Sequence, residues 1–91
     1  MNLDDYRQQI DRADDALLRA FCDRMDIAAK IAACKKEQDL PVLDSARERQ
    51  KLKTIAEKAG PEMEDYATVL YALLFELSRA YQGHLLERPR S

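Results

Sequence analysis

The sequence predicts an all-α protein, and three observations favour that fold class. The 91 residues include only two glycines and three prolines, so few positions interrupt a helix. Alanine, leucine, glutamate, lysine, arginine and glutamine dominate the composition, and these residues favour helices over strands. Apolar residues also recur at steps of three and four, which is the spacing of one helix face. The length gives room for one domain, spanning residues 1–91.

The first helix is predicted from about residue 3 to residue 37. Neither glycine nor proline occurs in this stretch, and its apolar seam alternates steps of three and four residues. Such a helix is roughly 50 Å long at ~1.5 Å per residue, which exceeds the size of a compact monomer of this length. The seam positions are Leu3, Tyr6, Ile10, Ala13, Leu17, Ala20, Arg24, Ile27, Ile31 and Cys34.

The second helix is predicted from about residue 45 to residue 59. The connection before it, residues 38–44, contains a proline, and either Asp44 or Ser45 can cap the helix that follows. Gly60, followed by a proline, stops the helix.

The third helix is predicted from about residue 62 to residue 87, and it leads to an expected assembly. Its apolar positions are Met63, Tyr66, Leu70, Leu73, Leu74, Leu77, Tyr81 and Leu85. One short and one medium helix cannot cover the seam of the long first helix. We therefore expect an intertwined six-helix homodimer in which the two long helices run antiparallel.

Charge and hydropathy exclude several classes of function. The net charge is −2, whereas nucleic-acid binders normally carry a basic excess. No stretch approaches the ~20 apolar residues of a membrane span, and the first residues do not resemble a secretory leader. Cys22 and Cys34 lie about 18 Å apart along one helix at ~1.5 Å per residue, too far to bridge within a chain. We expect a soluble, cytoplasmic protein that binds neither nucleic acid nor membranes.

The sequence offers little for metal, cofactor or covalent chemistry. His84 is the only histidine, so a metal site is not expected. Nothing in the sequence resembles a glycine-rich phosphate loop, a Rossmann turn or a pair of nucleophile and base. Any chemistry must therefore depend on binding and electrostatics, with no cofactor.

Two cations interrupt the apolar face of the first helix. Arg24 occupies a seam position, and Lys35 lies eleven residues later, about 20° around the same face. A charge drawn into an apolar interior needs a counter-charge, so the pair suggests a dianionic ligand. Arg24 alone can equally be interpreted as a residue that sets the packing register or extends to the rim.

Arg7 also borders the seam, about 25 Å from Arg24 along the axis at ~1.5 Å per residue. Within one chain the two arginines cannot hold the same small molecule. In an antiparallel pair of helices, however, Arg7 of one chain comes alongside Arg24 and Lys35 of the other. Taken alone, Arg7 is better interpreted as a surface arginine near a helix start.

Ser78 and Gln82 on the third helix lie four residues apart, and both can point into the bundle. They can serve as neutral donors to an oxygen-rich ligand. They can equally be bonded to helix carbonyls or to each other.

The start of the second helix also allows two interpretations. Ser45 and Glu48 fit a capping box, which alone would explain the glutamate. In the other interpretation, Arg47 and Glu48 face the same cavity as Lys35, where Arg47 binds a carboxylate and Glu48 accepts a ligand hydroxyl.

A series of short elements runs in order across the three predicted helices: Arg7, Ile10-Asp11, Asp15, Leu17-Leu18, Arg24-Met25, Lys35, Pro41-Val42, Asp44, Arg47-Glu48-Arg49, Ser78-Arg79 and Gln82. Together they closely resemble the helical chorismate mutases over nearly the whole chain. Asp39 stands where relatives often have a small or turn-favouring residue. The chain looks like a free-standing mutase, without a fused dehydratase or dehydrogenase.

The resemblance implies an isomerase of the shikimate pathway, which serves aromatic amino acid biosynthesis by converting chorismate to prephenate. It implies a homodimer of three-helix chains with two active sites, each receiving Arg7 from the neighbouring subunit. It also implies that Arg7 and Arg24 bind the substrate carboxylates, and that Lys35 and Gln82 donate to the ether oxygen of the breaking bond. Glu48 would hold the ring hydroxyl, and the pocket would be completed by Asp44, Arg47 and Ser78.

Two other functions stay open from the sequence. An isochorismate-pyruvate lyase shares the fold of the resembled family, but such lyases tend to lack the hydroxyl-binding glutamate and the Ser-Arg pair, here Glu48 and Ser78-Arg79. A non-catalytic helical dimerisation module would use Arg24 and Lys35 only for salt bridges between chains.

Overall fold

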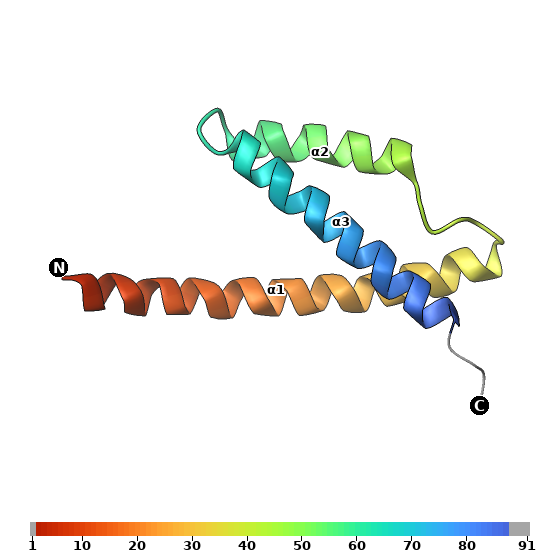
Figure 1. Cartoon of the computed structure of the whole chain (residues 1–91), viewed down its shortest axis with the longest axis horizontal. Coiled ribbons are helices and arrows are strands. Elements are labelled where there is room, and N and C mark those ends of the chain that lie inside the picture. The colour runs from red at the N-terminus through yellow and green to blue at the C-terminus, as the bar shows by residue number, and fades with distance from the viewer. Residues whose placement is uncertain (1, 88–91) are drawn as a thin grey trace.

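The computed structural model describes residues 2–87, which form three α-helices and no strand, and this confirms the predicted all-α fold class (Figure 1). The helices are α1 (Leu3–Glu37), α2 (Ser45–Ala59) and α3 (Glu64–Glu87). α3 starts two residues later than the predicted position 62, because residues 61–63 form a turn. The N–H groups of Met63 and Glu64 both donate to the carbonyl oxygen of Gly60, at 3.1 and 2.9 Å.

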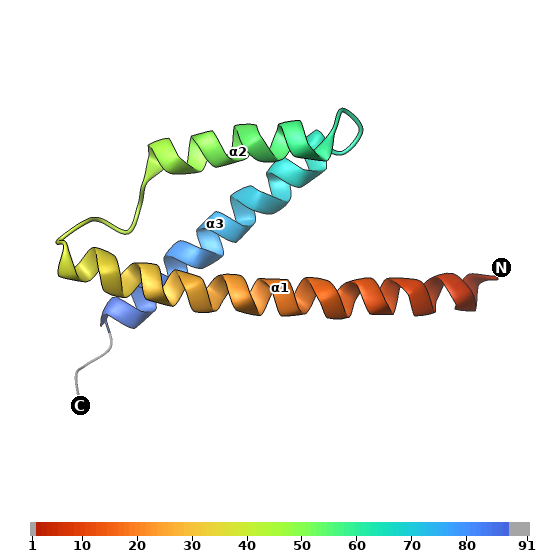
Figure 2. The same cartoon turned by 180° about the vertical axis from the view of Figure 1, so that it is seen from behind.

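α3 holds the three helices together. It runs obliquely from the end of α2 to the C-terminal half of α1 and packs against both helices (Figures 1 and 2). The N-terminal half of α1 extends beyond this contact. The chain measures 54 × 33 × 14 Å, and its radius of gyration is 16.6 Å. A compact domain of this length has a radius of gyration of about 12 Å, so the chain is elongated and thin.

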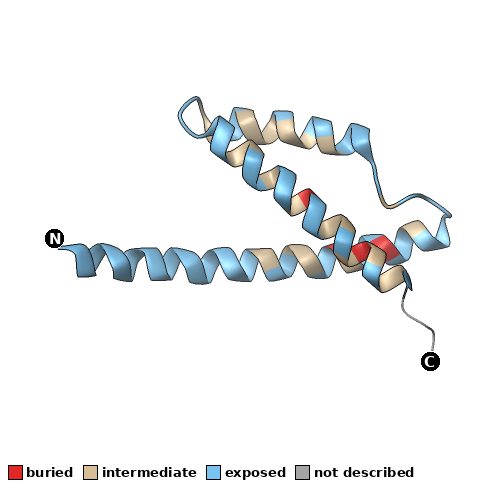
Figure 3. Ribbon diagram, viewed as in Figure 1, coloured by how far each residue is buried: buried red, intermediate tan, exposed pale blue. Residues whose placement is uncertain are grey.

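The single chain buries very little. Among residues 2–87, the buried apolar residues are Ala28, Ala32 and Phe75, where α1 and α3 pack together. Every residue from 2 to 20 is exposed (Figure 3). The accessible surface is 7512 Å², whereas a compact monomer of this mass exposes about 5,400 Å². The excess surface includes large apolar side chains of the seam, such as Ile10 and Leu17, each 60% exposed.

The start of α2 is capped by Asp44, whose side chain accepts a hydrogen bond of 3.0 Å from the backbone N–H of Arg47. The alternative capping box from Ser45 to Glu48 is therefore wrong. Ser45 is already the first helical residue, and the carboxylate of Glu48 is bound elsewhere, as described below. The cap leaves the Arg47 and Glu48 side chains free to lie on the first turn of the helix.

The end of α1 is closed by a Schellman motif. The N–H of Leu40 donates to the carbonyl oxygen of Lys35 at 2.8 Å, and the N–H of Asp39 donates to that of Lys36 at 3.2 Å. Asp39 has a φ of 56°, in the left-handed region that most side chains avoid. The motif turns the chain sharply and directs residues 40–44 back toward α2.

Two further features can be checked directly. Cys22 and Cys34 are both free thiols, in agreement with a spacing too long for a bridge within one chain, and both are exposed. Among the helices formed by residues 2–87, none is long and apolar enough to cross a membrane.

Candidate active site

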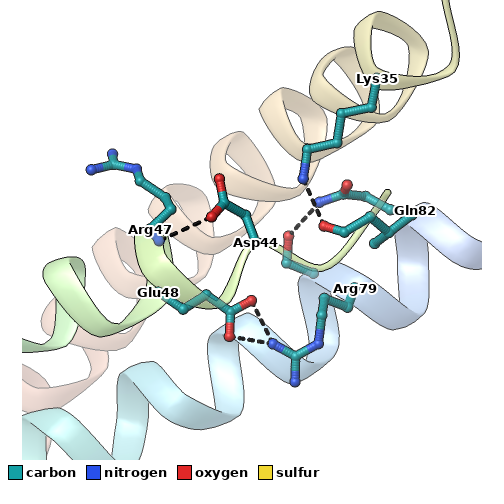
Figure 4. Close-up of polar contacts among 8 residues, drawn as sticks. Lys35, Asp44, Arg47, Glu48, Arg79 and Gln82 are labelled. Carbon is teal, nitrogen blue, oxygen red and sulfur yellow. Dashed lines mark hydrogen bonds and ion pairs between the residues drawn. The ribbon is translucent and has the colours of Figure 1, made fainter. Parts of the chain in front are cut away.

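A cavity of about 530 Å³ opens where the three helices and the connection after α1 approach one another. Its wall contains seven of the eight residues predicted to form a ligand site. They come from separate parts of the chain: Arg24, Lys35, Asp44, Arg47, Glu48, Ser78 and Gln82. The fold thus gathers these side chains around one space, and several of them are drawn in Figure 4.

The cavity wall combines an excess of positive charge with an apolar surface. Five cationic side chains face only two carboxylates, those of Asp44 and Glu48. The cations are Arg24, Lys35, Arg47, Lys51 and Arg79. Between them lie the apolar side chains of Ile27, Ala28, Ile31, Val42, Tyr71 and Phe75. Such a wall suits a small ligand that carries more than one negative charge on an apolar body.

Arg24 is half-buried and lies against two aromatic rings. Its guanidinium carbon is 5.8 Å from the ring centroid of Tyr71 and 5.6 Å from that of Phe75. The two rings meet edge to face with centroids 6.1 Å apart. These cation–π contacts orient the guanidinium, yet Arg24 forms no ion pair with any residue of the described range 2–87. Its charge is therefore available to an anion in the cavity.

Lys35 lies in the last turn of α1, and its ammonium reaches the connection that follows. The Nζ atom donates a hydrogen bond of 2.6 Å to the carbonyl oxygen of Val42. An ammonium group has three N–H donors, so two remain after this bond. The contact holds the charged end of a flexible side chain at the cavity wall (Figure 4).

Gln82 is 5% exposed, and its side-chain amide has one satisfied atom and one unsatisfied atom. The Nε2 atom donates to the Ser78 hydroxyl oxygen at 3.1 Å. The buried Oε1 atom has no hydrogen-bond partner among residues 2–87. If the amide turns by half a circle, the Ser78 hydroxyl donates to Oε1 and Nε2 becomes free. In either orientation one buried polar atom of Gln82 has no partner. An unsatisfied buried polar group costs about 1–3 kcal/mol, so a hydrogen bond between this atom and a ligand is favourable.

Glu48 is bound by Arg79 across the gap between α2 and α3. The Nη1 atom of Arg79 donates to both carboxylate oxygens of Glu48, and the two side chains are 31% and 25% exposed. Both residues line the cavity (Figure 4). The pair fixes an anionic acceptor beside the cationic side chains.

Comparison with protein families shows the family of this chain. The family model of chorismate mutase type II matches residues 6–83. The chain belongs to this family. The resemblance stated from the ordered sequence elements is thereby confirmed, and the matched segment contains Arg7 and every residue that lines the cavity. Comparisons with curated proteins and with solved structures gave no match.

One residue of the expected chorismate mutase site lies outside the cavity. Arg7 is in the extended half of α1, where it forms an ion pair of 3.8 Å with Asp4. The two side chains are 67% and 83% exposed. As its spacing from Arg24 predicts, Arg7 cannot join the cavity of its own chain.

Two cavity residues, Arg79 and Lys51, were missed as site residues at the level of sequence. Arg79 belongs to the Ser-Arg pair that related lyases tend to lack, but the resemblance implies no site role for it, and no pattern in the sequence assigns a role to Lys51. A helical signal existed for Lys51, because it follows Arg47 by four residues and so shares its face of α2. For Arg79 the signal was weaker, since its partner Glu48 lies 31 residues away on another helix.

Proposed function

We propose that this chain is a chorismate mutase that rearranges chorismate to prephenate. The observation that carries this proposal is the cavity of a family member in which five cations surround an apolar space. The reaction breaks a C–O bond and forms a C–C bond within one molecule, and it transfers no proton. An enzyme for this reaction needs only to hold the substrate folded and to stabilise developing charge.

Lys35 and Gln82 are proposed to act at the ether oxygen, where negative charge grows as the C–O bond breaks. Lys35 keeps two N–H donors free after its bond to Val42. Gln82 supplies a neutral donor when its amide is turned so that the Ser78 hydroxyl donates to Oε1. A donor whose hydrogen bond strengthens only as charge develops stabilises the transition state more than the bound substrate. It therefore lowers the barrier to the reaction.

The remaining cavity residues are proposed to bind the ground-state groups of the substrate. Arg24 has an uncompensated charge, and it binds one carboxylate. Arg47 binds a carboxylate of the substrate. Ser78 completes the pocket together with Asp44, which caps α2. Glu48 accepts the ring hydroxyl.

A second copy of the chain is proposed to complete each site. The two α1 helices run antiparallel, and Arg7 of the partner subunit enters the cavity beside Arg24. If Arg7 lies opposite residues 24–35 of the other chain, the twofold axis passes near residues 16–21. A groove of about 510 Å³ opens there between α1 and α3, lined by residues that include Leu17, Leu18 and Leu74. An interface on this groove would cover the apolar side chains that the single chain exposes. The two exposed free thiols fit a reducing, cytoplasmic location.

The test is a product analysis with two substrates. Purified protein is incubated with chorismate, the loss of chorismate is followed by absorbance, and the product is identified by mass spectrometry and NMR. The same protein is then incubated with isochorismate. Formation of prephenate from chorismate supports the proposal, whereas pyruvate and salicylate from isochorismate would identify the lyase instead.

A variant distinguishes the enzyme from a non-catalytic dimerisation module. Arg24→Leu is expected to give a folded dimer without mutase activity, because a carboxylate of the substrate loses its arginine partner. If wild-type protein converts neither substrate and Arg24→Leu only raises the thermal midpoint, Arg24 serves packing alone and the proposal is wrong.

A further inference from the structure

The contact between Arg79 and Glu48 is a side-chain ion pair that links α2 to α3. One nitrogen, Nη1 of Arg79, donates to both oxygens of the Glu48 carboxylate. Both side chains line the cavity and are only partly exposed. The link therefore lies in the wall of the proposed active site and not on the outer surface.

Glu48 has a competing partner on its own helix. Lys51 lies three residues later, at a spacing that allows an ion pair along one helix face, and it also lines the cavity. The Asp44 carboxylate lies one turn earlier, and its repulsion disfavours a Glu48 rotamer that points back along the helix. The helix alone thus leaves the direction of the Glu48 carboxylate open. In the structure it is Arg79, from another helix, that fixes this direction.

The geometry leaves Glu48 able to bind a ligand while it is paired. A carboxylate has about four lone-pair sites, and Arg79 occupies two of them. The paired carboxylate also repels a dianionic substrate less than an unpaired one does. An arginine in this position can therefore orient an acceptor and neutralise it at once.

We propose that Arg79 is a positioning residue that holds the Glu48 carboxylate as the acceptor for the substrate's ring hydroxyl. The inference rests on the proposed mutase function. In this proposal Arg79 affects substrate binding through Glu48. The ring hydroxyl lies away from the bonds that break and form, so its contact is similar in the substrate and in the transition state. Loss of such uniform binding raises KM more than it lowers kcat.

A double-mutant cycle tests the inference, with kcat, KM, helix content and thermal midpoint measured for each protein. Arg79→Met is expected to raise KM for chorismate about tenfold and to change kcat by less than about threefold. In the Glu48→Met background, Arg79→Met is expected to change KM by less than about threefold, because both acceptor oxygens that Arg79 positions are gone. Arg79→Lys is expected to recover most of the affinity, since one nitrogen serves both oxygens.

The control is Arg49→Met, because Arg49 is exposed on α2 and is not part of the cavity wall. It removes the same charge and is expected to leave KM and kcat unchanged. If Arg79→Met has a lower helix content than the wild type, Arg79→Gln replaces it in the cycle.

The outcomes separate the inference from the function on which it rests. If Arg79→Met raises KM by the same factor in both backgrounds, the inference is wrong. It is also wrong if Arg79→Met lowers only kcat, and does so in proportion to its loss of folded protein. Unchanged KM in Glu48→Met, which has no acceptor oxygen at this position, also overturns it. Normal turnover by the wild type accompanies each of these results. A wild-type protein that leaves chorismate unchanged overturns the proposed function, and the inference falls with it.

Discussion

Lys35 donates from Nζ to the carbonyl oxygen of Val42 at 2.6 Å, and this bond ties the cation to the connection between α1 and α2. The same residue uses its backbone carbonyl oxygen to accept from Leu40 in the Schellman motif. Both ends of Lys35 are thus held at one place. The ammonium is therefore held in position before a ligand binds, which is the condition for electrostatic preorganisation.

Lys35→Met is expected to lower kcat by about 10²- to 10³-fold, the usual loss when a donor to developing charge is removed. Steady-state kinetics with chorismate measure this effect. Lys36→Met is the matched control, because Lys36 is exposed and adjacent in sequence. If both variants retain wild-type kcat, Lys35 does not contact the reacting oxygen.

Gln82→Glu tests whether the neutral amide acts as a donor. A glutamate at this position can donate only when protonated, so the variant is expected to be active at acidic pH and to lose activity as the pH rises. The wild type is expected to stay active from neutral to mildly alkaline pH, because an amide does not titrate. Profiles of kcat against pH for both proteins decide this. A wild-type activity confined to acidic pH contradicts the assignment.

Mixing two inactive variants tests the shared site. Arg7→Ala and Arg24→Ala each leave both sites of a homodimer defective. In an equal mixture about half of the dimers are mixed, and each of these has one intact site, so about a quarter of wild-type activity is expected to return. The measurement is activity after the two proteins are unfolded together and refolded. A mixture as inactive as its components would place both arginines in the same chain's site or outside any site.

Leu17→Asp tests the apolar seam as the contact between chains. A carboxylate at this exposed seam position is expected to split the dimer, because it would be buried without a partner on association. Sedimentation velocity measures the change in mass. Gln8→Asp is the control, since Gln8 is exposed and lies between seam positions of α1. Dissociation of both variants to the same extent would point to charge and not to the seam.

Asp39→Gly is expected to stabilise the folded protein by about 0.5–1 kcal/mol, because Asp39 has a φ of 56° that glycine adopts without steric cost. Urea unfolding followed by circular dichroism measures the difference. Gln38 has a φ of −93°, so Gln38→Gly is the opposite control and is expected to lower stability. Destabilisation by both glycines would mean that the Asp39 side chain, and not its backbone, matters.

The sequence predicts those features of this fold that depend on local rules. The absence of glycine and proline before Pro41 and the seam spacing predict a long first helix, since helix formation depends on neighbouring residues. The sequence does not distinguish Asp44 from Ser45 as the cap of α2, because both side chains can accept a hydrogen bond from a helix N–H. Only the three-dimensional path of the connection selects Asp44.

The candidate site also contains features that the sequence predicts and features that depend on how the helices pack. Arg24 and Lys35 could be placed together because they lie on one helix, where 100° per residue fixes their relative direction. Glu48 could be placed near them, but its partner Arg79 could not be predicted, because the angle between α2 and α3 decides which side chains meet. From the sequence, Gln82 and Ser78 can be either ligand donors or partners of each other. In the structure they bond to each other, and the Oε1 atom of Gln82 has no hydrogen-bond partner among residues 2–87.

Arg24 and Tyr71 line the cavity and also the groove between α1 and α3. A ligand in the cavity and a partner chain in the groove can therefore contact the same two side chains. If a second copy binds at the groove, as proposed, and raises the ligand affinity of the cavity through these side chains, thermodynamic reciprocity requires that the ligand raises the affinity between the two chains by the same factor. In that case a saturating ligand is expected to keep the proposed dimer associated at protein concentrations where the ligand-free protein dissociates.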